Sequence, residues 1–171
     1  MNVFDFAMKM ETDGKAYYEK LARETSLSGL RGIFTQLAAD EAKHYEIFAA
    51  LKSGGQAPSM RETTILEEVK NVFAGLSREA TALQGAQADL AAYQQAMKLE
   101  SDSFRLYEDA AAKEQNAGVK ALLLQIAGEE HKHFNVLANI FQFVNAPNQY
   151  LAWREFSNLD EFHQFGRDVD A

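Results

Sequence analysis

One pattern of six polar residues divides this chain into two matching halves, and it restricts the possible folds more than any other feature. Two residues separate a glutamate from a histidine at Glu41 and His44, and the same spacing recurs at Glu130 and His133. A further glutamate lies 30 residues before each pair. The full set is Glu11, Glu41 and His44 in the first half and Glu100, Glu130 and His133 in the second.

The two halves are related by a gapless shift of 89 residues that extends well beyond the six polar positions. The shift superimposes Met8–Asp13 on Met97–Asp102, Tyr18 on Tyr107, Gly29 on Gly118 and Gln36–Ala38 on Gln125–Ala127. A repeat of this length indicates one structural unit used twice. It also predicts an approximate two-fold axis, with equivalent side chains supplied from each half.

Hydrophobic spacing identifies the repeated unit as a helical hairpin. Apolar residues recur three and four positions apart over residues 4–25, 29–52, 87–115 and 119–144, as in helices that bury one face. Breaks at Ser26–Gly29, Ser53–Pro58 and Asn116–Gly118 separate them, and Ser28 is expected to cap the second helix. Two hairpins joined by a long connection predict an all-α, ferritin-like four-helix bundle.

The remaining segments are expected to be accessory to one domain spanning residues 1–171, with the bundle at about 3–145. Residues 59–86 are expected to form the crossover, with a short amphipathic helix over 64–73 and no metal ligands of its own. The C-terminal tail, 146–171, is rich in aromatic residues. It is expected to form short helices that cover the bundle or contact a second subunit.

Composition excludes several classes of function. The formal charge of −8 disfavours a nucleic-acid backbone or an anionic membrane as the main partner. The sequence has no cysteine, so these residues form no disulfide, zinc–thiolate site or cysteine-ligated iron–sulfur cluster. We identify neither a signal peptide nor an apolar run long enough to span a membrane, and we therefore expect a cytoplasmic protein.

The six polar residues are predicted to hold metal ions. Each stands in the apolar stripe of its helix, where leucine or isoleucine would be usual. Ionised carboxylates in such a place are costly unless they are paired or metal-bound, and four in one layer would repel each other. Two divalent cations would balance the four negative charges. Oxygen and imidazole ligands without sulfur suit iron or manganese, and also zinc.

The six residues, and the tyrosines and histidines near them in the sequence, have alternative interpretations. A hydrogen-bonded layer of glutamate and histidine without metal is the alternative to the metal site. Tyr18 and Tyr107 follow Glu11 and Glu100 by seven residues on the same helix face. They are expected either to hydrogen-bond the carboxylates or to be ordinary core tyrosines. His131 is expected at the surface, and His163 in the tail is expected to have no special role.

The six residues and their spacing resemble the di-iron signature of the rubrerythrins in the ferritin-like superfamily, over roughly residues 3–145. The resemblance implies that Glu41 and Glu130 bridge two irons, with Glu11, His44, Glu100 and His133 each binding one. Typical rubrerythrins have a further glutamate where this chain has Ser103, so the ligand set looks like the symmetric one of bacterioferritin. Typical members also carry a rubredoxin-like domain, whose cysteines are lacking here.

The resemblance implies a di-iron oxidoreductase of peroxidase or ferroxidase type, reacting with hydrogen peroxide or dioxygen in oxidative stress. Electrons would come from an external donor, either a rubredoxin-like protein or a small reductant, and the aromatic tail suggests a homodimer. Two alternatives are kept. The chain could store iron as a ferritin-like shell, or act as an oxygenase on an organic substrate, which would need a pocket beside Glu100 and Ser103.

Overall fold

The chain forms a four-helix bundle of ferritin-like topology, which confirms the predicted fold class. A computed structural model describes residues 2–56, 59–76 and 90–145. The bundle helices are α1 (Val3–Glu24), α2 (Ser28–Lys52), α5 (Leu90–Lys113) and α6 (Ala117–Asn145), and a shorter helix, α3 (Ile65–Leu76), follows the first hairpin. The predicted start of the third helix at 87 and the tail at 146–171 lie outside the described residues.

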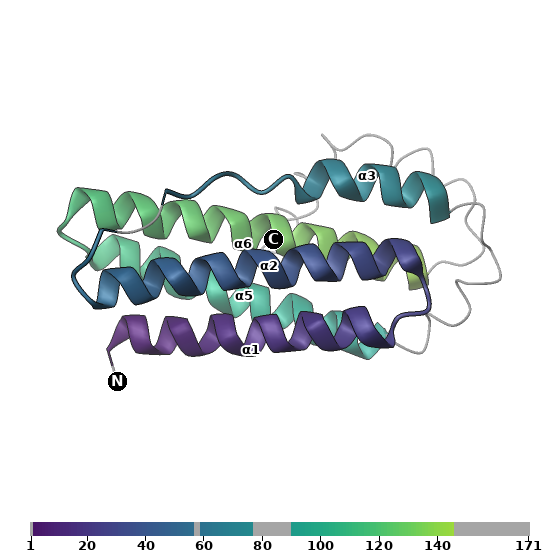
Figure 1. The fold of residues 1–171 in the computed structure, drawn as a ribbon, viewed down its shortest axis with the longest axis horizontal. Coiled ribbons are helices and arrows are strands. Elements are labelled where there is room, and N and C mark those ends of the chain that lie inside the picture. The colour runs from purple at the N-terminus through teal and green to yellow at the C-terminus, as the bar shows by residue number, and fades with distance from the viewer. Residues whose placement is uncertain (1, 57–58, 77–89, 146–171) are drawn as a thin grey trace, which may run out of the picture.

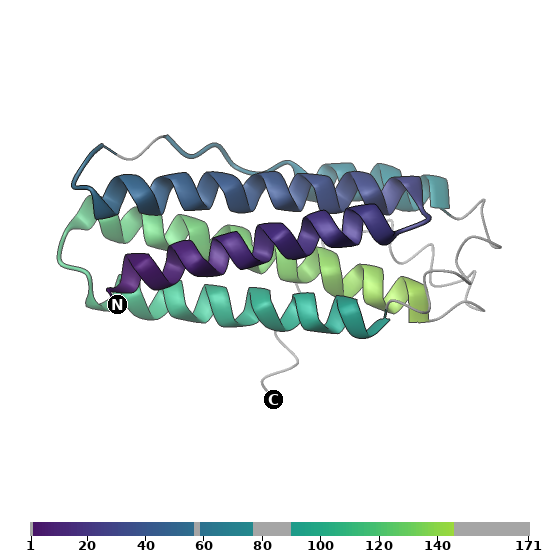
Figure 2. The same ribbon diagram turned by 60° about the horizontal axis from the view of Figure 1, so that its bottom comes forward.

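The two hairpins pack side by side as the repeat predicts. The most extensive contacts are within the hairpins, between α1 and α2 and between α5 and α6, while α1 also contacts α5 and α2 contacts α6. In Figure 2, α1 crosses the face between α2 and α5. Each hairpin therefore supplies two adjacent sides of a common core.

The two hairpin turns are stabilised by different hydrogen bonds, although the repeat superimposes their sequences. Asn116 caps α6, because its side-chain oxygen accepts hydrogen bonds from the backbone N–H groups of Gly118 and Val119 at 2.9 and 3.1 Å. The prediction that Ser28 caps α2 was wrong, since Ser28 is already helical and Leu27 is the capping position. There the Arg31 guanidinium holds the turn by donating to the carbonyl oxygens of Ala22 and Thr25.

The core consists of two apolar clusters with a polar layer between them. One cluster surrounds Phe34 and Tyr93 near the turn between α1 and α2, and the other surrounds Phe48 and Tyr107 near the turn between α5 and α6. The six polar residues of the repeat lie between the clusters, at the middle of the four helices. Apolar packing on both sides keeps water from the layer and fixes the helices that carry it.

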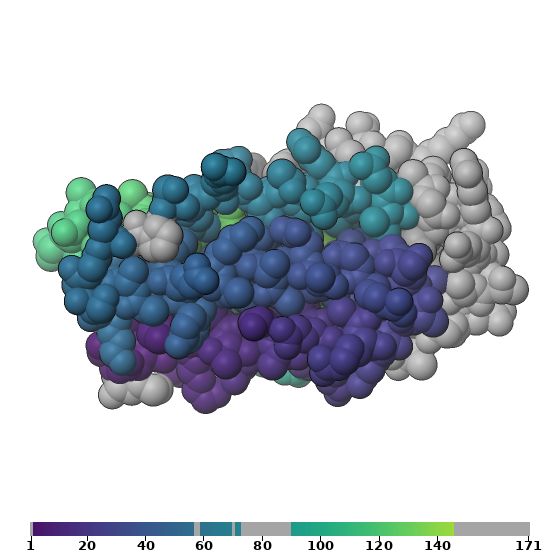
Figure 3. Space-filling model, in the orientation of Figure 1, coloured from purple at the N-terminus to yellow at the C-terminus, as the bar shows by residue number. Residues whose placement is uncertain are grey.

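The crossover returns along the outside of α2 and α6 before α3 begins. Figure 3 shows the residues after α2 lying along one edge of that helix. The Gln125 side chain of α6 donates to the carbonyl oxygen of Met60 at 3.4 Å, and Ile65 is fully buried. The predicted short helix is present, although it runs from 65 to 76 instead of 64 to 73.

Candidate metal centre

The polar layer brings together all six residues singled out from the sequence. Glu11 comes from α1, Glu41 and His44 from α2, Glu100 from α5, and Glu130 and His133 from α6. Each is at most 4% exposed, and His44, Glu130 and His133 are fully buried. Side chains i and i+3 on a helix share a face, so each glutamate–histidine pair projects into the core together.

The six side chains form two overlapping groups, each suited to a single cation. One group is Glu11, Glu41, His44 and Glu130, and the other is Glu41, Glu100, Glu130 and His133. Within each group one potential ligand atom from every residue lies within 4.8 Å of the others. Glu41 and Glu130 belong to both groups, which is the arrangement that two bridging carboxylates would have.

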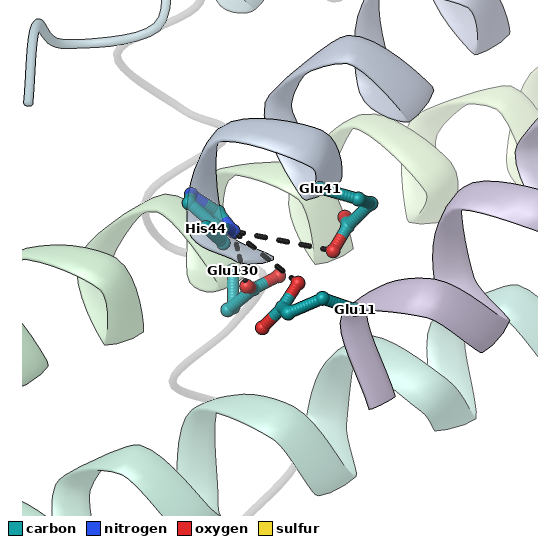
Figure 4. Close-up of side chains that lie close together, drawn as sticks. All are labelled: Glu11, Glu41, His44 and Glu130. Carbon is teal, nitrogen blue, oxygen red and sulfur yellow. Dashed lines mark ion pairs between the residues drawn. The ribbon is translucent and has the colours of Figure 1, made fainter. Parts of the chain in front are cut away.

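The histidine Nδ1 atoms point into these groups. Nδ1 of His44 lies 2.9 Å from Oε1 of Glu130 and 3.6 Å from Oε2 of Glu11. Figure 4 shows this histidine facing Glu11, Glu41 and Glu130. Nδ1 of His133 lies 3.2 Å from Oε1 of Glu41 and 3.3 Å from Oε2 of Glu130. Both rings therefore present the same nitrogen to the shared carboxylates.

Several of these inward atoms lack a hydrogen-bond partner among the described residues. They include Nδ1 of both histidines, both carboxylate oxygens of Glu130, Oε1 of Glu41 and Oε2 of Glu11. Buried polar atoms without partners are costly, and here they converge on the two groups. A cation at each group would satisfy them, so the residues present fit a pair of metal ions.

Two further carboxylates hold the outer nitrogens of the histidines. Nε2 of His44 lies 3.0 Å from Oε2 of Glu129, and Nε2 of His133 lies 3.4 Å from Oδ2 of Asp40. Asp40 and Glu129 are themselves buried. A carboxylate at Nε2 favours a proton there and leaves the lone pair of Nδ1 directed inward, as metal-binding histidines require.

Sequence reasoning missed Asp40 and Glu129. The 89-residue shift superimposes one on the other, and each directly precedes a glutamate of the polar layer. That match was available as a signal. The residue before a core position usually lies toward the edge of the helix face, so the apolar stripe alone does not single out either one.

Tyr18 and Tyr107 were expected either to hydrogen-bond the carboxylates or to be ordinary core residues, and both descriptions apply to each of them. Tyr18 and Tyr107 are 2% and 0% exposed. The Tyr18 hydroxyl donates to Oε1 of Glu100, and the Tyr107 hydroxyl donates to Oε1 of Glu11. Each hairpin thus supports the upstream glutamate of the other.

Without a cation, the layer retains protons that isolated groups would release. Burial and then the charge of Glu130 raise the pKa of Glu41 well above its usual value, and the same two causes raise the pKa of Glu100 to about 8. Burial alone would lower the pKa of His44 and His133, but the surrounding carboxylates outweigh it and raise both. A bound cation would displace these protons.

A small cavity of about 60 Å³ reaches one side of the layer between α1 and α5. Glu41 and Glu100 line it, together with Tyr18, Gly14 and Ser103. Gly14 and Ser103 superimpose under the repeat, so two small residues lie where the helices approach. At Gly14 an added Cβ would be 3.5 Å from the carboxylate of Glu41, which shows how closely α1 approaches it.

His131 stands apart from the layer. His131 is at the surface, where its ring stacks on Phe104 and its Nε2 lies 3.2 Å from the carboxylate of Glu108. His163 lies outside the described residues. Within the described residues, none of the helices is long and apolar enough to cross a membrane.

Comparison with known proteins identifies the family. The profile of the rubrerythrin family matches residues 2–141. No curated protein and no solved structure matches this chain. The match covers the first hairpin, the second hairpin up to residue 141, and every residue of the two cation-sized groups. The helical bundle, its repeated glutamate–histidine motif and this match agree, and the chain belongs to the rubrerythrin family of ferritin-like, di-iron proteins.

Proposed function

We propose that this chain binds two iron ions in the polar layer and reduces hydrogen peroxide, with dioxygen as a slower oxidant. The observation that carries the proposal is the pair of overlapping groups that share Glu41 and Glu130. Their unpartnered atoms are oxygens and imidazole nitrogens, the ligands that iron accepts in carboxylate-rich sites. Manganese and zinc accept the same ligands and are the alternatives for the metal.

The proposed ligand roles follow from membership of the groups. Glu41 and Glu130 are common to both and would bridge the ions. Glu11 and His44 would bind one ion, and Glu100 and His133 the other. Glu129 and Asp40 would hold the two histidine rings through Nε2.

The reaction has a simple balance. Reducing one hydrogen peroxide to two water molecules takes two electrons and two protons, and breaks the O–O bond. When bound, a pair of ferrous ions supplies those two electrons by becoming ferric. We propose that a separate donor, either a rubredoxin-like protein or a small reductant, returns them, because the sequence has no cysteine for an iron–sulfur cluster of its own.

The protein's part is to admit a small oxidant, exclude bulk water and hold a proton beside the oxidant. The cavity at Glu41 and Glu100 is about 60 Å³, which suits a molecule of the size of peroxide. Tyr18 lines it, and the Tyr18 hydroxyl already donates to Glu100. Burial and the Glu100 charge raise the pKa of Tyr18, so this hydroxyl keeps its proton at neutral pH.

The cavity also bears on the oxygenase alternative. Pockets for organic ligands usually measure roughly 300–1,000 Å³. The space beside Glu100 and Ser103 is far smaller, at about 60 Å³. We therefore favour a small inorganic oxidant over an organic substrate.

We also propose that the protein is cytoplasmic, that it forms a homodimer and that it acts in oxidative stress.

The test is to load metal-free protein anaerobically with two Fe(II) per chain and then mix it with peroxide or, separately, with air-saturated buffer. We expect oxidation to be faster with peroxide, to consume one peroxide per two irons and to stop there. If further additions of Fe(II) were then oxidised to many irons per chain, in a particle much larger than a dimer, the result would indicate storage instead. Glu130→Ala, which removes a shared carboxylate, is the control.

A further inference from the structure

One residue of the crossover, Thr63, donates a hydrogen bond to a carboxylate of each hairpin. Its backbone N–H donates to Oε1 of Glu129 on α6 at 2.9 Å, and its hydroxyl donates to Oδ2 of Asp40 on α2 at 2.6 Å. Thr63 lies two residues before α3 begins and is partly buried. A single residue outside both hairpins thus contacts an equivalent carboxylate in each.

Each of these carboxylates also lies beside Nε2 of one histidine of the layer. The Asp40 oxygen that accepts from the Thr63 hydroxyl is the same atom that faces Nε2 of His133. Glu129 accepts from Thr63 at one oxygen and faces Nε2 of His44 with the other. Both imidazole rings are therefore connected to Thr63 through one intervening carboxylate.

The connection is not symmetric, although the repeat is. Thr63 offers its side chain to the α2 carboxylate and its backbone to the α6 carboxylate. The distance from carboxylate to histidine also differs. Oδ2 of Asp40 lies 3.4 Å from Nε2 of His133, whereas Oε2 of Glu129 lies 3.0 Å from Nε2 of His44. Its other oxygen, Oδ1, accepts from Gln36 and Lys43, whereas the repeat partner of Gln36, Gln125, turns to the crossover at Met60.

We propose that Thr63 is a positioning residue that orients both metal-binding histidines and makes the two metal positions unequal. The position served by His133 depends on the Thr63 hydroxyl through Asp40. The position served by His44 depends on the Thr63 backbone amide through Glu129, and every substitution of Thr63 except proline keeps that N–H group. This inference rests on the proposed metal site.

A purely structural role for Thr63 has to be separated from this one. The Thr63 hydroxyl oxygen also accepts from the backbone N–H of Ile65 at 3.3 Å, at the start of α3. Its neighbour Thr64 contributes to the same first turn by donating to Glu68 at 3.2 Å. Thr64→Val is therefore a matched control, because it removes a threonine hydroxyl from the same turn at a residue that does not donate to Asp40 or Glu129.

The test is an anaerobic titration of the metal-free chain with Co²⁺, whose visible spectrum reports ligand binding at each position. We expect Thr63→Val to weaken one of the two positions about tenfold and to leave the other within about twofold, the range seen for groups that support metal ligands. Thr63→Ser should restore the wild-type affinity, and Thr64→Val should change neither position. Asp40→Asn should weaken the same position, and adding Thr63→Val to it should have little further effect.

A second measurement identifies the affected histidine. In the Co²⁺-loaded protein each imidazole N–H proton gives a shifted NMR signal, which Asp40→Asn and Glu129→Gln assign. In Thr63→Val the His133 proton should exchange with solvent faster than in wild type, and the His44 proton should not. Should Thr63→Val fail to fold, Thr63→Ala removes the same hydroxyl.

The outcomes separate this inference from the proposed function. Two-site binding by wild type, with Thr63→Val unchanged or with both positions weakened equally, would overturn the role of Thr63 alone. No stoichiometric Co²⁺ binding by wild type would overturn the metal site and the inference together.

Discussion

The Tyr18 hydroxyl of the first hairpin donates a hydrogen bond to the Glu100 carboxylate of the second hairpin. The Tyr107 hydroxyl of the second hairpin donates the equivalent bond to the Glu11 carboxylate of the first. The two bonds cross the interface between α1 and α5 at the level of the polar layer. They tie each upstream glutamate to the opposite hairpin, so the carboxylates are oriented before any cation arrives.

Replacing these tyrosines should therefore separate metal binding from oxidation. Tyr18→Phe and Tyr107→Phe should each lower affinity at one metal position by roughly tenfold, the size usual for a lost supporting hydrogen bond. Because Tyr18 lines the cavity, only Tyr18→Phe should also slow oxidation by peroxide when both positions are full. Stopped-flow measurements at saturating iron test this, and equal oxidation rates for the two variants would contradict it.

Glu41→Gln should stabilise the metal-free protein while removing its response to metal. Burial and the charge of Glu130 hold the pKa of Glu41 well above its usual value, so a neutral amide resembles its metal-free state. Wild type should gain about 5–10 °C in Tm at a metal concentration near 100 times the Kd. The variant should gain much less, as thermal unfolding with and without Mn²⁺ would show.

His131→Ala is the control for that experiment, because His131 lies at the surface and outside the layer. Its metal-dependent gain in Tm should equal that of wild type. A Glu41→Gln protein that gained as much as wild type would show that Glu41 is not a ligand.

The stability of the metal-free protein should fall as pH rises from about 5 to 8. The pKa of Glu100 is raised from 4.5 to about 8, so in this range the folded state holds a proton that the unfolded state releases. The raised pKa values of Glu41, His44 and His133 act in the same direction, whereas the lowered pKa of Glu130 acts below about pH 4.5.

We expect the metal-free Tm to drop by roughly 5 °C or more across this range. The metal-loaded Tm should hold steady or rise, because cations replace the protons and bind more tightly as the pH rises. Calorimetry of both forms at matched ionic strength measures the difference. A metal-free Tm that increased steadily to pH 8 would contradict the assigned charges.

Filling the cavity should block the oxidant without disturbing the metal. Ser103→Leu adds three carbon atoms to a space of about 60 Å³, so we expect peroxide oxidation to slow by roughly tenfold while two irons remain bound. Ser101→Leu places the same side chain on the same helix away from the cavity lining and should leave the rate near wild type. An unchanged rate in Ser103→Leu would mean that peroxide reaches the layer by another route.

Much of this architecture can be predicted from the sequence, for reasons visible in particular residues. Glu11 and Glu100 interrupt apolar stripes whose spacing is helical, and the gapless repeat relates them to each other. A polar residue in such a stripe must lie in the core. The fold and the meeting of the six residues in one layer follow from that placement.

The parts that escaped prediction depend on tertiary geometry. Thr63 lies in a connection whose path over α2 and α6 no local pattern specifies, and its bonds to Asp40 and Glu129 require that path. The difference between the caps at Leu27 and Asn116 also escaped prediction. The Leu27 side chain makes no capping hydrogen bond, and the Arg31 guanidinium holds that turn instead by donating to the carbonyl oxygen of Ala22. Such contacts are set by the packed bundle and not by helix periodicity.

The most direct test of the central claim is the number of Fe(II) ions bound per chain, measured anaerobically by equilibrium dialysis and metal analysis. We predict saturation at two ions for wild type and for His131→Ala, and severe loss of both ions in Glu41→Ala and Glu130→Ala, whose carboxylates both groups share. If those two variants bound as much iron as wild type, or if wild type bound none stoichiometrically, the polar layer would not be a metal centre.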